Sequence, residues 1–153
     1  MIASDFFFID MERLINQSEA GININKKIKQ LQEFKTIKIK KNQDNLKKKE
    51  SDLINQKNII SPELFDKNLL AHKKEINEFR KMRDMERKDF ENKKIEYTSK
   101  LLNVINPILK DYVKSKNISI LLEKKNIILG ANEFDITNEI IKILNIKIND
   151  IKL

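Results

Sequence analysis

The sequence contains no cysteine and no tryptophan, and only two glycines and two prolines occur among its 153 residues. The absence of cysteine excludes disulfide bonds and thiol chemistry. No apolar run approaches the roughly 20 residues that a membrane-spanning helix needs. Between Gly21 and Gly130 the only helix-breaking residues are Pro62 and Pro107. This scarcity predicts two long helices that fold back on each other at Ser61 and Pro62.

Positive charge is concentrated between the two ends of the chain. Ile22–Lys116 carries 25 Lys and Arg against 14 Asp and Glu, a net charge of +11, whereas Met1–Gly21 has a net charge of −3 and Asn117–Leu153 is neutral. A basic excess confined to one element indicates an acidic partner, such as nucleic acid, anionic lipid or an acidic polypeptide. Solvation of exposed helices explains the same lysines equally well, so both interpretations stay open.

The expected helical hairpin has a weak apolar pattern. Ile39, Leu46, Leu53 and Ile60 recur every seven residues, which is the coiled-coil period. One apolar residue per heptad is half of a coiled-coil seam, so we expect thin packing and easy local opening toward the tip. Ser61 is expected to cap the return helix, with Pro62 at its first position. Further along, Pro107 should bend that helix.

Strand-like segments flank the hairpin on both sides. Phe6–Ile9 is expected to form a buried strand, and Ile118–Leu122 and Ile127–Leu129 are expected to form a β-hairpin. We therefore predict an α+β fold, with a β-rich body formed by residues 1–21 and 117–153. A coiled-coil arm formed by residues 22–116 has its tip near residues 59–63.

Three short-range signals place the helices of the body. Asp10 is the expected N-cap of a short helix with Met11, Leu14 and Ile15 facing inward. Gly21 is expected to change the direction of the chain before the arm. Asp135 is expected to cap a last helix, whose apolar face consists of Ile136, Ile140, Ile141 and Leu144. The state of residues 146–153 is left open.

Residues suited to catalysis are scarce. The single histidine, His72, lies on a lysine-rich helix and is interpreted as a solvated surface residue. The carboxylates near Asp84 and Glu86 alternate with Lys and Arg, as in surface ion pairs along a helix. No phosphate-binding loop, dinucleotide fingerprint or metal-ligand spacing occurs. We therefore expect neither an enzyme nor a bound cofactor or metal.

Two groups of residues at the ends of the chain resemble the Skp/OmpH family of bacterial periplasmic chaperones. They are Ile9-Asp10-Met11 with Ser18–Gly21, and Ile128–Asn132 followed by Asp135-Ile136-Thr137. The resemblance covers essentially the full length, although the arms match only in length and character. It implies a homotrimer whose strands assemble a central β-barrel, with three arms around a cavity that holds unfolded outer-membrane proteins without ATP. It also implies a periplasmic location, with the signal peptide removed from this chain.

Candidate binding residues follow from composition and from this resemblance. The candidate client-binding residues are basic or soft apolar side chains of the arm, namely Lys40, Lys41, Lys47, Lys48, Lys49, Phe79, Met82, Met85 and Phe90. Some members of the family have a proposed lipopolysaccharide-binding basic motif, for which the nearest candidates are Arg80, Lys81, Arg83, Arg87 and Lys88. The expected trimer interface consists of Phe6, Phe7, Phe8, Ile118, Ile120, Leu122 and Ile128.

Three other classes of protein have related features. A nucleic-acid-binding coiled-coil arm would explain the basic hairpin but would not explain the β-rich body. In prefoldin-like cytosolic chaperones the β-hairpins lie between the two helices, whereas here the strands lie outside them. A scaffolding coiled coil would need denser heptads than Ile39, Leu46, Leu53 and Ile60 provide.

Overall fold

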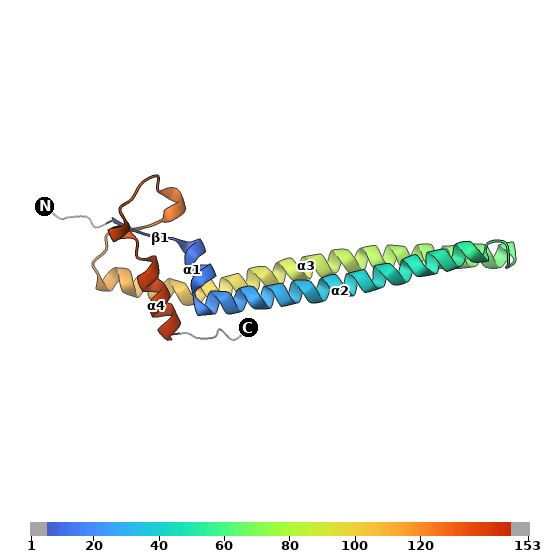
Figure 1. Ribbon diagram of the computed structural model, residues 1–153, viewed down its shortest axis with the longest axis horizontal. Coiled ribbons are helices and arrows are strands. Elements are labelled where there is room, and N and C mark those ends of the chain that lie inside the picture. Colours follow the sequence, from blue (N-terminus) through green and yellow to red (C-terminus); the bar gives the residue numbers. More distant parts are fainter. Residues whose placement is uncertain (1–5, 148–153) are drawn as a thin grey trace. The chain divides into compact units, whose positions relative to one another are not determined.

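The computed structural model describes residues 6–147 (Figure 1). The chain forms two compact units. The first, called the base unit here, contains the described residues up to Ile28 and from Lys94 onward. The second, called the arm unit, is Lys29–Lys93. Two long helices, α2 (Glu19–Gln56) and α3 (Pro62–Ser115), contribute residues to both units. The base unit therefore includes helical turns as well as the two ends of the chain.

The remaining elements all belong to the base unit. They are β1 (Phe6–Ile9), α1 (Met11–Gln17), β2 (Ile120–Glu123), the 3-10 helices η1 (Lys124–Asn126) and η2 (Asn132–Phe134), and α4 (Thr137–Lys147). Together with α2 and α3 they give a mostly helical α+β fold with a small sheet.

The predicted hairpin of long helices is confirmed. The chain reverses between Gln56 and Pro62, and Ser61 caps the return helix by accepting a hydrogen bond from the Leu64 backbone N–H over 3.3 Å. Glu63 lies in the first turn of α3, where the helix dipole favours a carboxylate. Pro107 lies inside α3, which continues to Ser115.

The predicted β-hairpin in the second half of the base is wrong. The described residues form a two-stranded sheet in which β1 and β2 are parallel, with Phe6 opposite Ile120 and Phe8 opposite Leu122. The chain turns through η1 after β2, and Ile127–Leu129 forms no strand. Parallel pairing joins segments more than a hundred residues apart, so short-range turn signals do not indicate it.

The change of direction before the arm occurs at Ser18 rather than at Gly21. Ser18 ends α1 in an extended conformation, and its Oγ accepts a hydrogen bond from the Gly21 N–H over 3.2 Å at the start of α2. Gly21 itself is helical. A Cβ at Gly21 would lie 1.8 Å from the carbonyl oxygen of Ile15, so the position requires glycine because α1 and α2 approach closely.

One apolar core holds the base unit together. The predicted inward residues Leu14, Ile140 and Leu144 are fully buried, and Ile136 is almost so. Met11, Ile15 and Ile141 pack at the edge of this core, as predicted. The buried members come from β1, α1, both long helices, α4 and the residue before α4, namely Ile9, Leu14, Ala20, Ile24, Leu101, Ile105, Ile108, Ile136, Ile140 and Leu144.

Hydrogen bonds around Thr137 join the first helix of the base to the last. The buried Oγ1 of Thr137 accepts a hydrogen bond from the backbone N–H of Asp10 over 2.9 Å and donates its own proton to Asp135 Oδ1. Asp10 in turn caps α1 by accepting a hydrogen bond from the Arg13 N–H, as predicted. Asp135 lies two residues before α4 begins and accepts a hydrogen bond from the Thr137 N–H over 3.0 Å.

Charges reinforce this contact between the two ends of the chain. Arg13 lies 3.8 Å from Asp135, and Lys124 lies 3.7 Å from both Asp10 and Asp135. Burial raises the pKa of Asp135, but hydrogen bonds from Thr137 and the charges of Arg13 and Lys124 outweigh this effect, so its pKa is lowered. The carboxylate therefore stays charged where the two ends meet.

We expect Thr137→Val to destabilise the base by about 1–3 kcal/mol, because the half-buried Asp10 N–H loses its acceptor. Thr137→Ser keeps the hydroxyl and loses one methyl group, so it should cost only about 1 kcal/mol. Urea denaturation of the variants at equal protein concentration measures both values. A valine variant as stable as the serine variant would show that the hydroxyl contributes nothing.

Candidate functional site

The α2 side of the arm unit's seam contains polar residues at every second core position. In α2 the apolar heptad positions alternate with a second series, also seven residues apart, that reads Lys35, Asn42, Lys49 and Gln56. Among the described side chains of the arm unit, those classed as buried are Lys35, Leu53 and His72, each 8% exposed. A coiled coil of this composition gains little from apolar burial, as the spacing of its leucines and isoleucines predicts.

Lys35 forms the most buried ion pairs of the arm. Its Nζ lies 2.5 Å from Glu86 and 2.6 Å from Asp89, and Lys38 also lies 2.5 Å from Glu86. Burial lowers the pKa of Lys35, but the hydrogen bonds and charges of Asp89 and Glu86 outweigh it and raise the pKa. Hydrogen bonds from Lys35 and Lys38 lower the pKa of Glu86 to about 2. These pairs link α2 to α3 at one fixed register.

His72 is buried, and the prediction of a solvated surface histidine is wrong. Neither of its ring nitrogens has a hydrogen-bond partner among residues 6–147. It lies midway between Phe65 and Phe79, seven residues from each, and this spacing places it in the seam. It lines a cavity of about 260 Å³ together with Leu53 and Glu75.

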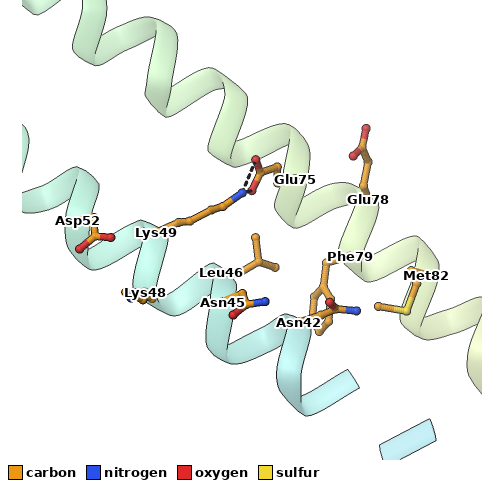
Figure 2. Close-up of a pocket in the computed structure, with 10 residues that line it drawn as sticks. All are labelled: Asn42, Asn45, Leu46, Lys48, Lys49, Asp52, Glu75, Glu78, Phe79 and Met82. Atoms are coloured by element: carbon orange, nitrogen blue, oxygen red, sulfur yellow. Dashed lines mark hydrogen bonds and ion pairs between the residues drawn. The ribbon is translucent and has the colours of Figure 1, made fainter. Parts of the chain in front are cut away.

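A groove of about 610 Å³ opens between the two helices of the arm unit (Figure 2). Leu46, Phe79 and Met82 form its apolar floor, and Figure 2 shows Phe79 pointing toward α2. At one end Lys49 is paired with Glu75, with an Nζ–Oε2 distance of 2.7 Å. The residues that line the groove are Asn42, Asn45, Leu46, Lys48, Lys49, Asp52, Glu75, Glu78, Phe79 and Met82.

A second groove, of about 600 Å³, lies elsewhere in the arm unit. Ile39 and Phe90 supply its apolar surface, and Arg83 and Arg87 contribute guanidinium groups. Three carboxylates lie among these arginines, and one of them, Asp84, is 3.7 Å from Arg83. The lining residues are Gln32, Lys35, Thr36, Ile39, Arg83, Asp84, Glu86, Arg87, Phe90 and Glu91.

The structure therefore gathers part of the predicted client-binding set. Lys48, Lys49, Phe79 and Met82 share the first groove, and Phe90 lines the second. The other predicted residues of the arm are exposed on the helices, and Met85 is 69% exposed. They are Lys40, Lys41, Lys47, Arg80, Lys81, Met85 and Lys88.

Sequence reasoning missed four further residues of the arm. Asn42 and Asn45 lie in the first groove, and the seven-residue spacing from Lys35 through Asn42 to Lys49 was the available signal. Phe34 and Ile37 are about two-thirds exposed, at 67% and 68%, on α2. They fall outside the heptad pattern, and such off-pattern apolar residues are the sequence signal for an exposed binding surface.

The predicted interface residues of the base fall into two sets. Phe8 and Ile118 are covered within one chain, whereas Phe6, Ile120 and Leu122 are 51%, 42% and 42% exposed. By their register Phe6, Phe8, Ile120 and Leu122 share one face of the sheet, and Phe7 lies on the other face against the core.

Two features of the sheet and its surroundings expose further apolar groups. Ile128 is fully exposed in the segment after η1. In the described part of the chain, no strand pairs with the free edge of β2. An apolar sheet face beside an unpaired strand edge is a surface that other proteins commonly cover with a partner.

Within residues 6–147 no cluster of three metal-ligating side chains occurs. No helix in that part of the chain is long and apolar enough to cross a bilayer. Among curated proteins, no relative matches the sequence significantly.

Two comparisons identify similar proteins. The sequence profile of the OmpH-like outer membrane protein family matches residues 5–144. Among solved structures, the fold is similar to that of a putative outer membrane chaperone (OmpH-like) from Caulobacter crescentus CB15. The TM-score is 0.90 at 14% sequence identity, and the match covers 100% of this chain and 90% of the other.

The Glu86 ion pairs make the arm sensitive to acid. The pKa of Glu86 is lowered from its ordinary value of 4.5 to about 2, so the stabilisation is fully present above pH 4.5 and is lost as the pH falls toward 2. Glu86→Gln should therefore lower the midpoint of thermal unfolding at pH 5, and the gap to the wild type should close by pH 2. Circular dichroism melting curves between pH 2 and 6 measure this gap.

Glu50→Gln is the matched control, because Glu50 is exposed and has no ion pair within the described residues. Its difference from the wild type should stay small across the same range. A gap for Glu86→Gln that is equally wide at pH 2 and pH 5 would contradict the assigned role of these pairs.

Proposed function

Because the chain belongs to the OmpH-like outer membrane protein family, we propose that it is an ATP-independent chaperone that holds unfolded outer-membrane proteins in the periplasm. The observation that carries this proposal is the surface of the arm unit, where soft apolar side chains lie among many lysines and arginines. Such a surface offers many weak contacts to an unfolded chain. Weak contacts suit a chaperone that prevents aggregation and then releases its client.

The exposed apolar side chains support this role. Phe34, Ile37, Leu70 and Met85 are each about two-thirds exposed, between 67% and 69%. Within the described residues, packing does not offset the unfavourable free energy of exposing these apolar side chains to water. Single exposed apolar residues are common, but four large ones on two helices provide contacts for client side chains.

We propose that three copies assemble through their base units. The exposed face that carries Phe6, Ile120 and Leu122 and the unpaired edge of β2 support this arrangement. Strands from neighbouring copies would pair along that edge and close a small barrel, which would remove the open edge. The arms of three copies would then surround a cavity for the client.

Nucleic-acid binding is the main rival function, because the basic charge of the arm would also suit a phosphate backbone. The arginines of the second groove argue against it, since Asp84, Glu86 and Glu91 lie among them. The same carboxylates weigh against the lipopolysaccharide site proposed for Arg83 and Arg87. Prefoldin-like proteins place their strands between the helices, unlike the order observed here.

The function is tested by diluting a urea-unfolded outer-membrane β-barrel protein into buffer and following its aggregation by light scattering. The full chain should suppress scattering without ATP at about one assembly per client. An equal amount of a basic, non-coiled protein serves as the control for charge alone. Unsuppressed aggregation, together with tight and steeply salt-dependent binding to a short DNA duplex, would favour the rival.

Ile120→Asp places a charge on the exposed sheet face and should dissociate the assembly, because a buried carboxylate in the interface has no partner. Multi-angle light scattering should give a mass near three times the 18.1 kDa of one chain for the wild type and near one chain for the variant. Ile54→Asp, at a 64% exposed position of the arm, is the matched control and should stay assembled. A wild-type mass of a single chain at micromolar concentration would refute the trimer.

The positive charge of the arm should speed capture of acidic clients. Lys40, Lys41 and Lys47 form no ion pair within the described residues, so their reversal to Glu removes free positive charge without breaking a bridge. Stopped-flow association with an acidic unfolded client should slow several-fold, and its dependence on salt should flatten. Reversal of Lys142 in α4 is the control. If the association rate of the wild type does not depend on salt, charge plays no part in capture and apolar contacts alone explain it.

A further inference from the structure

The first groove of the arm unit carries two carboxamides that the fold does not use. The side-chain amides of Asn42 and Asn45 form no hydrogen bond with any other described residue, and both residues line the groove. Figure 2 shows them on the side of α2 that faces α3, beside Leu46 and Phe79. Each side-chain amide offers two N–H donors and one carbonyl acceptor. The groove therefore presents unpaired donors and acceptors directly above an apolar floor.

The charges around this groove are nearly balanced. Lys49 is paired with Glu75, so it is not available for an acidic ligand. Lys48 and Asp52 also line the groove, and Glu78 points away from α2 (Figure 2). With two lysines against three carboxylates, the lining does not select a ligand of either sign. This groove therefore does not recognise its ligand by charge.

An extended polypeptide has the chemistry that matches these features. Each residue of an unfolded chain carries a free backbone N–H and a free C=O, which a carboxamide can satisfy together. Alternate side chains of an extended segment point to the same side, so one of them can rest on Leu46, Phe79 and Met82. The volume of about 610 Å³ lies within the roughly 300–1,000 Å³ of ordinary ligand pockets and accommodates a few residues.

We propose that this groove binds an extended segment of unfolded polypeptide through its main chain, with Asn42 and Asn45 hydrogen-bonding the backbone and one apolar client side chain on the floor. The inference rests on the proposed chaperone function and specifies how a client is recognised. Main-chain recognition is independent of client sequence. It requires only that the segment is unfolded, since a folded client has its backbone groups already paired.

The test uses a fluorescently labelled, uncharged ten-residue peptide with alternating phenylalanine and serine or threonine, and the full-length protein. Fluorescence anisotropy measures its affinity for the wild type and for the Asn42→Leu/Asn45→Leu double variant. Loss of the backbone hydrogen bonds should weaken binding about tenfold. Asn77→Leu is the control, because Asn77 is exposed on α3 outside the groove.

The leucine substitutions separate main-chain recognition from simple apolar capture. Leucine has nearly the shape of asparagine and is more apolar, so a purely hydrophobic groove would bind the peptide equally well or more tightly. A peptide methylated at alternate backbone nitrogens should bind the wild type about as weakly as the double variant binds the parent peptide. Unchanged or tighter binding of the parent peptide by the double variant would overturn the proposal.

Two further measurements assign the cause of a negative result. Phe79→Ala should also weaken binding several-fold, and if it has no effect, the peptide does not occupy this groove and the inference fails. Circular dichroism and light scattering of each variant confirm that helicity and mass are unchanged, which excludes occupation by a second copy. Failure of the wild type to suppress aggregation would refute the proposed function, whereas unchanged suppression with unchanged peptide binding would refute this inference alone.

Discussion

The structure depends on one contact between the two ends of the chain. Thr137 joins Asp10 to Asp135 by hydrogen bonds, and Arg13 and Lys124 neutralise the two carboxylates. More than 110 positions of sequence separate Asp10 and Arg13 from Lys124, Asp135 and Thr137, so this contact closes the base unit around a long intervening hairpin. Asp10, Asp135 and Thr137 are also among the residues that carry the resemblance to the family. Their pattern in the sequence therefore reflects the closure of the base unit rather than a binding site.

The base and arm units are stabilised in different ways. Ten buried apolar residues form the core of the base unit, whereas Leu53 is the buried apolar residue among the described side chains of the arm. The arm relies instead on ion pairs such as Lys35–Glu86, which fix the register and whose stabilisation is lost in acid. Local opening should therefore cost less in the arm than in the base. A thin seam also leaves apolar and amide groups unpaired at the surface of the arm.

Short-range sequence signals predict the helices and their caps. The pairing of the strands depends on contacts between distant segments, which such signals do not indicate. The hairpin, the caps at Asp10 and Ser61 and the apolar face of α4 follow from residues within a few positions of one another. The parallel pairing of Phe6 with Ile120 depends on the closed base and has no short-range signal. The sequence predicts that Gly21 is needed for its backbone freedom at a change of direction. The structure shows that glycine is needed there because a Cβ would collide with the carbonyl oxygen of Ile15. The burial of His72 was predictable, because the Phe65–Phe79 spacing puts it in the seam.

Charge and main-chain recognition act at different distances, and this separation explains how one arm can both attract and release a client. The net charge of the lysine-rich helices acts over roughly a Debye length of 8 Å at physiological salt, and it raises the rate of encounter more than the strength of the final contact. The groove at Asn42 and Asn45 acts only at contact and has nearly balanced charge. A client that folds withdraws its backbone groups from such a groove, so in this proposal release follows from folding itself and needs no ATP.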